Sequence, residues 1–168
     1  MLDKVTHTLN SDVFHYLLDL EVKKAVRYLY FFSLAIIQSD RRFEKIETEE
    51  NLLRDLASLI RQEVRGTDIV GKMGSDTFFI LLHQADLHAV HGIGNRIRER
   101  IEQYGFQTNG EKVQITISMG AASFPSNANE LDSLIQKANE ALTTARGHGG
   151  NRVCLPEEGW NPWGHGTA

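Results

Sequence analysis

The sequence predicts an α/β sandwich, in which a central mixed β-sheet is surrounded by helices. Three observations support this prediction. Amphipathic segments of helical period alternate with short apolar runs along the whole chain. The apolar run at 31–37 is continuous, as expected for a strand that is buried on both faces. Two β-rich runs, 68–73 and 77–82, flank a turn that contains glycine, which indicates a β-hairpin in the middle of the chain.

Two helices are predicted on either side of the first strand. Asn10 or Ser11 can cap the first helix, and its apolar stripe consists of Phe14, Leu17, Leu18, Val22 and Val26. The charged stretch at 41–50 is typical of a solvated loop that leads into a second helix, with Thr48 as its cap. The predicted buried face of the second helix consists of Leu52, Leu53, Leu56, Leu59, Ile60 and Val64.

The second half of the chain continues the alternation of predicted helices and strands. A third helix is predicted to start near Asp86, and its two glycines, Gly92 and Gly94, permit close packing. Residues 113–119 alternate as a strand, Asn129 can cap a fourth helix, and residues 152–155 suit a last short strand.

Composition narrows the class of protein. With 168 residues, a net charge of −4 and a pI near 6.0, the chain is one domain without a global basic field for nucleic acid or for an anionic membrane. The single cysteine, Cys154, excludes an internal disulfide and fits a reducing compartment. No apolar run reaches the roughly 18 residues that span a bilayer. We expect a cytoplasmic domain at 1–155 with a Gly- and Pro-rich tail at 156–168, as a piece of a longer protein that could carry a membrane anchor.

Several segments match motifs of one protein family in their order and spacing. They are residues 3–10 (DKVTHTLN), 74–78 (GSDTF), 115–120 (ITISMG), 138–146 (ANEALTTAR) and 149–151 (GGN). They resemble the D-x-L-T-G-L-x-N start, the GGDEF or GGEEF signature, the V-T-I-S-I-G strand, the A-D-x-A-L-Y-x-A-K helix and the G-R-N ending of the GGDEF family of diguanylate cyclases. The resemblance implies the nucleotidyl-cyclase palm fold, which is related to ferredoxin-like domains.

The resemblance also locates the family's catalytic centre. Its members join two GTP molecules with metal ions that are held by an Asp at the end of the first strand and by the acidic third residue of the signature. Here the first position is Gln38, a neutral amide, whereas Asp76 keeps the second carboxylate. The family's guanine-binding N-D and G-H elements have no counterpart, because the segment after Gln38 is shorter, although Glu50 keeps one acidic position.

Further departures lie in the signature and the ending. Ser75 and Thr77 replace a Gly and a Glu of the signature, between the retained Gly74 and Phe78. Gly150 stands where the ending carries an Arg, although Arg146 keeps a positive charge one turn earlier. We therefore expect that cyclisation is lost and that the domain has no catalytic residue, bound metal or cofactor.

The family's product-binding inhibitory motif, R-x-x-D, is present at its usual spacing before the signature. It consists of Arg65 and Asp68, and Arg96 matches the Arg of a following E-R-I-R segment. An Arg fork matches the O6/N7 edge of guanine or a phosphate, and an Asp accepts from the donor edge of the base. Lys24 or Arg27 on the first helix could add charge. The alternative is a surface Arg–Asp pair that caps a helix end.

These features predict a receptor for cyclic di-GMP, with a ligand-bridged homodimer and regulation of a neighbouring domain or of an unidentified protein partner. Two alternatives stay open. The domain could be an interaction or dimerisation module that binds no cyclic di-GMP and keeps GTP in the degenerate site. It could also be a residual cyclase that uses Asp40 and Asp76 as Mg²⁺ ligands. Nucleic acid binding and membrane insertion are not expected.

Overall fold

The computed structural model describes residues 1–43 and 46–157 and confirms the predicted mixed α/β architecture. The main sheet has the strand order β2-β3-β1-β6-β7, and a separate ribbon consists of β4 and β5. All neighbours in the main sheet are antiparallel except β6 and β7, which are parallel. The strands are β1 (Phe32–Ser39), β2 (Ile69–Lys72), β3 (Thr77–His83), β4 (Phe106–Thr108), β5 (Glu111–Val113), β6 (Ile117–Phe124) and β7 (Arg152–Cys154).

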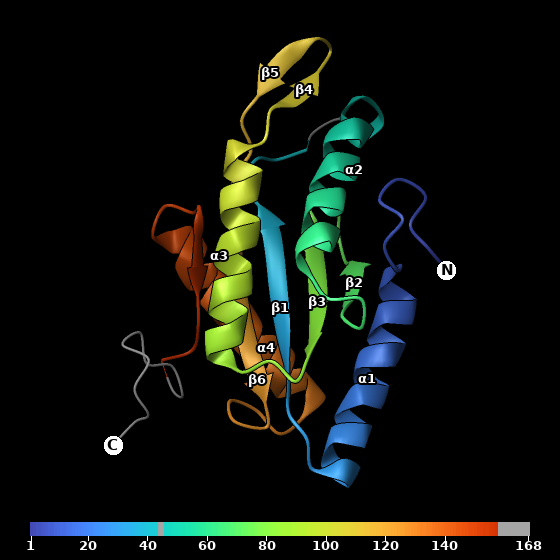
Figure 1. The fold of residues 1–168 in the computed structure, drawn as a ribbon, viewed down its shortest axis with the longest axis vertical. Helices are drawn as coiled ribbons and strands as arrows, with labels where there is room; N and C mark the ends of the chain where they lie inside the picture. Colours follow the sequence, from blue (N-terminus) through green and yellow to red (C-terminus); the bar gives the residue numbers. More distant parts are fainter. Residues whose placement is uncertain (44–45, 158–168) are drawn as a thin grey trace.

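Four helices cover the two faces of this sheet (Figure 1), namely α1 (Ser11–Tyr28), α2 (Ile46–Glu63), α3 (Leu87–Gln103) and α4 (Leu131–Gly147). One apolar core lies between the sheet and the pair α2 and α3, and the other lies between the sheet and the pair α1 and α4. The central strands β1 and β6 therefore carry apolar side chains on both faces, which explains their continuous apolar character.

The first helix begins where the sequence predicts. The side chain of Asn10 accepts a hydrogen bond from the backbone of Val13 at 3.0 Å, so Asn10 is the N-cap. The predicted stripe is wrong at its end, because Val26 is 59% exposed and Ala25 is buried in its place. The adjoining strand starts at Phe32 rather than at Phe31, which is 45% exposed.

The predicted cap of the second helix is also wrong. Helix α2 is already formed at Ile46, so Thr48 lies inside its first turn. Glu and Lys, which dominate this stretch, are good helix formers and allow an earlier start. The hairpin of β2 and β3 agrees with the prediction.

The region between α3 and α4 departs most from expectation. Helix α3 starts next to Asp86 as predicted, and Asp86 is its N-cap. Residues 113–119, however, are not one strand. Strand β5 ends at Val113 and pairs with β4, which the sequence analysis missed, whereas β6 starts at Ile117. The turn of this ribbon is Asn109-Gly110, with φ of 52° and 78°, and Asn-Gly is the strongest short hairpin signal.

Helix α4 starts one residue later than the predicted cap implies. Glu130, not Asn129, precedes the first turn of α4, and its side chain makes no capping hydrogen bond. The tail at 156–168 lies outside the described residues from 158 onward. Within the described ranges, the structure contains no helix long and apolar enough to cross a membrane.

Candidate functional site

A polar cleft of about 890 Å³ opens where β1 ends, beside the β2–β3 turn and the C-terminal end of α4. The register pairs Gln38 with Thr77 on one side and with Ser118 on the other, which brings the end of β1 next to the turn. The cleft is lined by Gln38, Arg42, Phe43, Ser75, Asp76, Thr143, Arg146 and Gly147. Glu50 and Gly74 do not line it, and Phe78 is fully buried in the core.

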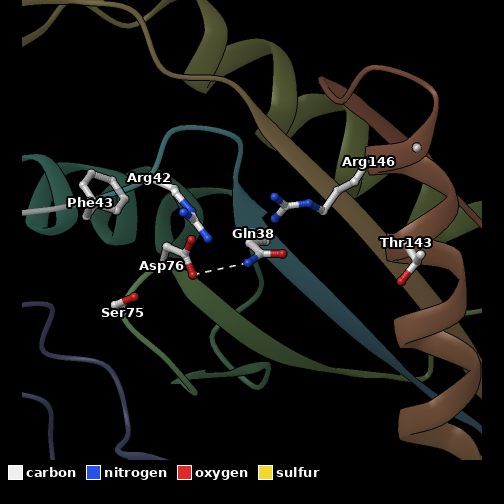
Figure 2. Close-up of a pocket in the computed structure, with 8 residues that line it drawn as sticks. Gln38, Arg42, Phe43, Ser75, Asp76, Thr143 and Arg146 are labelled. Carbon is white, nitrogen blue, oxygen red and sulfur yellow. Dashed lines mark hydrogen bonds between the residues drawn. The ribbon is translucent and has the colours of Figure 1, made fainter.

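The amide of Gln38 faces the carboxylate of Asp76 (Figure 2). Gln38 Nε2 donates to Asp76 Oδ1 at 3.4 Å, and Thr77 Oγ1 donates to the same oxygen at 3.1 Å. The backbone N–H of Ser39 also donates to the carbonyl of Asp76 at 3.0 Å, which fixes the turn against β1. Where a second carboxylate would be needed for a hard cation, the chain therefore presents a hydrogen-bond donor.

The carboxylate of Asp40 binds β6 and the residues just before β6 and β7. It accepts hydrogen bonds from Thr116 Oγ1 at 2.7 Å, from Ser118 Oγ at 2.6 Å and from the backbone N–H of Asn151 at 2.9 Å. These donors engage both of its oxygens. Asp40 therefore joins the end of β1 to β6 and to the loop before β7.

Gly150 lies directly against this carboxylate. Its φ is +73°, and a Cβ at this position would meet Asp40 Oδ1 at 2.8 Å. A glycine is required here because an L side chain would be strained in φ and would also contact the carboxylate. Gly150, which stands where the family's ending carries an Arg, thus allows the backbone to turn tightly around the Asp40 carboxylate.

Two arginines flank Gln38 in the cleft. Arg42 follows β1, Arg146 belongs to the last turn of α4, and both project toward Gln38 and Asp76 from opposite sides (Figure 2). Both are exposed. The sequence analysis placed Arg42 in a solvated loop, although its position four residues after Gln38 and four before the start of α2 was a usable signal. With two guanidinium groups and one carboxylate among the described residues that line it, the cleft suits an anion.

The predicted pair Arg65 and Asp68 is brought together in the turn between α2 and β2. Asp68 Oδ2 accepts from the backbone N–H of Arg65 at 3.0 Å and from Arg65 Nε at 3.3 Å. Asp68 Oδ1 accepts from the backbone N–H of His83 at 3.0 Å. The Asp68 side chain is 0% exposed, whereas that of Arg65 is 52% exposed and also donates to the carbonyl of His83. Asp68 thus holds the turn, and Arg65 presents its charge.

Arg96 reaches the same end of α2 from α3. Its Nε lies 3.4 Å from Glu63 Oε2, and Arg100 contacts the other oxygen of Glu63 at 2.9 Å. Glu63 lies two residues before Arg65, but no contact joins Arg96 to Arg65 in the described structure. Arg96 is 58% exposed. On the first helix, Arg27 lies over the ring of Tyr28, while Lys24 lines a cavity beside the Arg65–Asp68 turn.

Comparison with known proteins identifies the family. Residues 1–152 match the family model described as diguanylate cyclase, GGDEF domain. The chain belongs to the GGDEF family. Among curated relatives of this GGDEF domain, diguanylate cyclase DosC of Escherichia coli is 32% identical over 161 residues, which cover 92% of the chain and 35% of DosC. The uncharacterized protein YhcK of Bacillus subtilis is 34% identical over 110 residues, 65% of the chain and 31% of YhcK. The chain thus spans about a third of the length of these relatives.

Solved structures confirm that the fold is that of GGDEF domains. The GGDEF domain of YfiN from Pseudomonas aeruginosa superposes with a TM-score of 0.84 at 24% identity, over 94% of this chain and 95% of that one. The coiled coil and GGDEF domain of DgcB from Caulobacter crescentus, solved with c-di-GMP, gives 0.83 at 21% identity, over 92% of this chain and 85% of that one.

Proposed function

We propose that this GGDEF domain is a catalytically inactive receptor for cyclic di-GMP, which binds at Arg65, Asp68 and Arg96 and regulates a neighbouring domain or a protein partner. The observation that carries the proposal is the contrast between two surfaces. The cleft at the end of β1 offers an amide where a carboxylate is needed, while the turn before β2 offers the exposed guanidinium of Arg65, and α3 offers that of Arg96 at the end of α2.

The residues of the cleft do not fit a pair of magnesium ions. Among the residues that the structure describes, Asp76 is the one carboxylate that lines it, and its Oδ1 already accepts hydrogen bonds from Gln38 and Thr77. Asp40, the alternative ligand, is engaged with Thr116, Ser118 and Asn151. Hard divalent cations require several oxygen ligands. An amide whose nitrogen faces the site, as that of Gln38 does, does not supply such an oxygen. This donor set supports the loss of cyclisation.

The geometry of the Arg65–Asp68 turn supports ligand binding in a specific way. Asp68 fixes Arg65 through the backbone and through Nε, so that the Arg65 fork is partly preorganised and half exposed. Preorganised arginines bind phosphates and guanine edges in a bidentate manner. The DgcB structure was solved with c-di-GMP, which makes this ligand the natural one to test.

Calorimetric titration with cyclic di-GMP tests the proposal. We expect saturable binding that weakens at least tenfold in Arg65→Ala and in Arg96→Ala, because each removes charge-assisted hydrogen bonds of about 1.5–3 kcal/mol. Arg54→Ala, an exposed arginine of α2, is the matched control and should bind like the unmodified chain. Absence of binding to the unmodified chain would refute the proposal. Analytical ultracentrifugation with and without ligand tests whether the ligand bridges two copies.

Product analysis tests the loss of catalysis separately. The chain is incubated with GTP and Mg²⁺, and the mixture is assayed for cyclic di-GMP. We expect none, and product that disappears in Asp76→Asn would instead establish a residual cyclase.

A second candidate function is retention of a nucleotide in the degenerate cleft. It is favoured by the two exposed arginines, Arg42 and Arg146, that face each other across Gln38. Phosphate groups bound by arginines need no divalent cation. Titration with GTP in the presence of a chelator separates this candidate from the first, since binding there would be weakened by Arg146→Ala and not by Arg65→Ala.

A further inference from the structure

The outer side of α1 carries nearly all of the large apolar side chains that the described structure leaves exposed. Tyr104 is the exception. The helix lies at the margin of the molecule (Figure 1), and its side that faces away from the sheet is exposed. The apolar residues lie along the helix and at both of its ends, namely Met1, Leu2, Tyr16, Leu20, Val26, Tyr28, Leu29 and Phe31. An apolar surface that is concentrated along one element, rather than scattered singly, marks an interaction site.

The middle of this surface is a stripe of helical period. Its exposed members follow one another at intervals of three or four residues and are Asp12, Tyr16, Leu20, Lys23 and Arg27. The buried face of the same helix consists of Phe14, Leu18, Glu21, Val22 and Ala25. Glu21 is used within the fold, because it accepts a hydrogen bond from the Tyr30 hydroxyl at 2.6 Å. The stripe is thus the side of α1 that the core of this chain does not use.

The two ends of α1 extend the apolar surface. At the start, the backbone N–H of Asn10 donates to the carbonyl of Met1 at 3.0 Å, and Leu2 forms a β-bridge with Leu9, so Met1 and Leu2 lie beside the N-cap. At the end, Leu29 is 89% exposed and has a φ of 56°. Glycine is favoured in this left-handed conformation after a helix. A leucine there carries a conformational cost that burial within the fold does not offset.

The charge of the stripe changes sign along the helix. Asp12 lies in the first turn and Arg27 in the last turn, and Lys23 lies one turn before Arg27. Asp19 pairs with Lys23 at 2.8 Å near the middle. The stripe therefore has an acidic start, an apolar middle around Leu20 and a basic end. Such a pattern is complementary to a copy of itself that runs in the opposite direction.

We infer that this face of α1 docks a second copy of the chain, with the two α1 helices packed antiparallel about a twofold axis beside Leu20. Asp12 then faces Arg27 of the second copy, and Tyr16 faces Lys23 of the second copy, because both pairs share a midpoint between positions 19 and 20. A twofold axis makes each of these contacts twice. An ammonium group over a tyrosine ring adds a cation–π contact.

The same arrangement covers the apolar ends. The segment 26–31 of one copy extends over the start of α1 in the other, where Met1 and Leu2 are exposed. A lipid surface explains the pattern less well, because the acidic start of the stripe would be repelled by anionic headgroups. The inference goes beyond the proposed function, since this association requires no cyclic di-GMP.

The dimensions of the surface indicate a weak dimer. Helix α1 has 18 residues, which corresponds to a length of about 27 Å. One helix face with its two ends is smaller than the roughly 800 Å² per partner of a standard interface. We therefore expect a dissociation constant of roughly 1–100 μM.

Sedimentation velocity without nucleotide, at about 5–500 μM chain, tests the association. The unmodified chain should sediment faster as its concentration rises. Leu20→Glu should associate at least tenfold more weakly, because it places two carboxylates beside the axis. Arg65→Ala should associate like the unmodified chain, so a failure of the proposed function leaves this result unaffected. An unmodified chain that stays monomeric over the whole range would overturn the inference.

Charge reversal tests the antiparallel arrangement with residues that are exposed in the fold. Asp12→Lys and Arg27→Glu each place like charges opposite each other twice, so each variant alone should associate at least tenfold more weakly. An equimolar mixture of the two should associate again, because both contacts then join opposite charges. Asp132→Lys and Arg61→Glu reverse exposed charges in the first turn of α4 and the last turn of α2, and these matched controls should associate normally. A mixture that associates no better than its components would overturn the inference.

Flotation with vesicles that contain anionic lipid tests the competing occupant of this face. We expect the chain to remain unbound while it self-associates in solution. A chain that binds the vesicles and loses that binding in Leu20→Glu, without self-association, would assign the face to a lipid surface and overturn the inference.

Discussion

Replacement of Gly120 by alanine tests how closely α4 packs on the sheet. Gly120 lies in β6 beneath α4, and an added Cβ would meet the backbone N of Leu142 at 2.1 Å and the carbonyl O of Ala138 at 2.4 Å. Ordinary contacts of a Cβ begin at 3.4 Å, so α4 would have to move away by on the order of 1 Å. Both obstructing atoms belong to the backbone and cannot rotate aside.

The expected loss of stability follows from that displacement. Overpacking a core costs typically 1–3 kcal/mol, and obstruction by backbone places Gly120→Ala near about 2–3 kcal/mol. For a domain of this size, that corresponds to a fall in Tm of roughly 4–12 °C. The displacement also moves Thr143 and Arg146, which line the cleft from α4, so the second candidate function predicts that GTP affinity at the cleft falls as well.

Thermal unfolding by circular dichroism and urea unfolding provide the assay. Gly105→Ala is the control, because a Cβ there meets nothing within 4 Å and its φ is ordinary. We expect Gly105→Ala to be neutral or to stabilise by about 0.4–1 kcal/mol, through the lower entropy of the unfolded chain. Equal midpoints for the two variants would refute the packing argument.

Three further predictions concern single residues. Asp40→Ala should lower the free energy of unfolding by about 2–4 kcal/mol, because it removes the acceptor of three hydrogen bonds. In urea unfolding this loss should be the same with and without Mg²⁺. A loss seen only with Mg²⁺ would identify Asp40 as a metal ligand instead. The pKa of Tyr30, raised to about 12 by burial and by Glu21, should fall toward the usual value of about 10 in Glu21→Gln, as measured by ultraviolet difference titration against Tyr30→Phe. Since the folded chain holds this proton more tightly than the unfolded chain, the contribution of Tyr30 to stability is complete below about pH 10 and is lost as the pH rises toward 12; a Tyr30 pKa unchanged by Glu21→Gln would contradict the assigned hydrogen bond. Gly71→Ala should cost about 1–3 kcal/mol in the same unfolding assays, because its Cβ would meet the Phe14 ring at 2.6 Å, and a Phe14→Leu background should relieve part of that cost.

Periodicity predicted the helices and most of the sheet, because burial imposes a local pattern on each element. The continuous apolar run before Gln38 indicated a central strand, and β1 is buried on both faces. The sequence predicted Asn10 or Ser11 as the first cap and a helix start near Asp86, because a short polar side chain before an apolar stripe can accept from the first N–H groups of a helix; Asn10 and Asp86 do so. The ribbon of β4 and β5 was missed although its Asn-Gly turn is a local signal, since the apolar run after it was assigned to a single strand.

Errors at the ends of elements have a different cause. Whether Val26 or Ala25 faces the core depends on where α1 leaves the sheet, and the extent of α2 depends on what its first turn packs against. The local sequence pattern predicts neither of these, because the free energies of helices that start or end at adjacent residues differ little.

The sequence by itself determined which chemical groups this GGDEF domain possesses. It showed an amide at position 38, a carboxylate at position 76 and the spacing of Arg65, Asp68 and Arg96. Order and spacing along one chain were sufficient for the family, because a fold fixes the intervals between its motifs.

Only the tertiary structure decided what those groups face. It turned Asp40 toward Thr116 and Ser118, enclosed Asp68 behind two backbone N–H groups, and placed Arg42 across a cleft from Arg146. It also brought Glu21 from the first helix to His83 at the end of β3, across an interval for which the sequence holds no pattern. The physical reason is that the direction of a hydrogen bond and the burial of a charge depend on neighbours from distant segments, whose positions are set by the packing of the whole sheet and its helices.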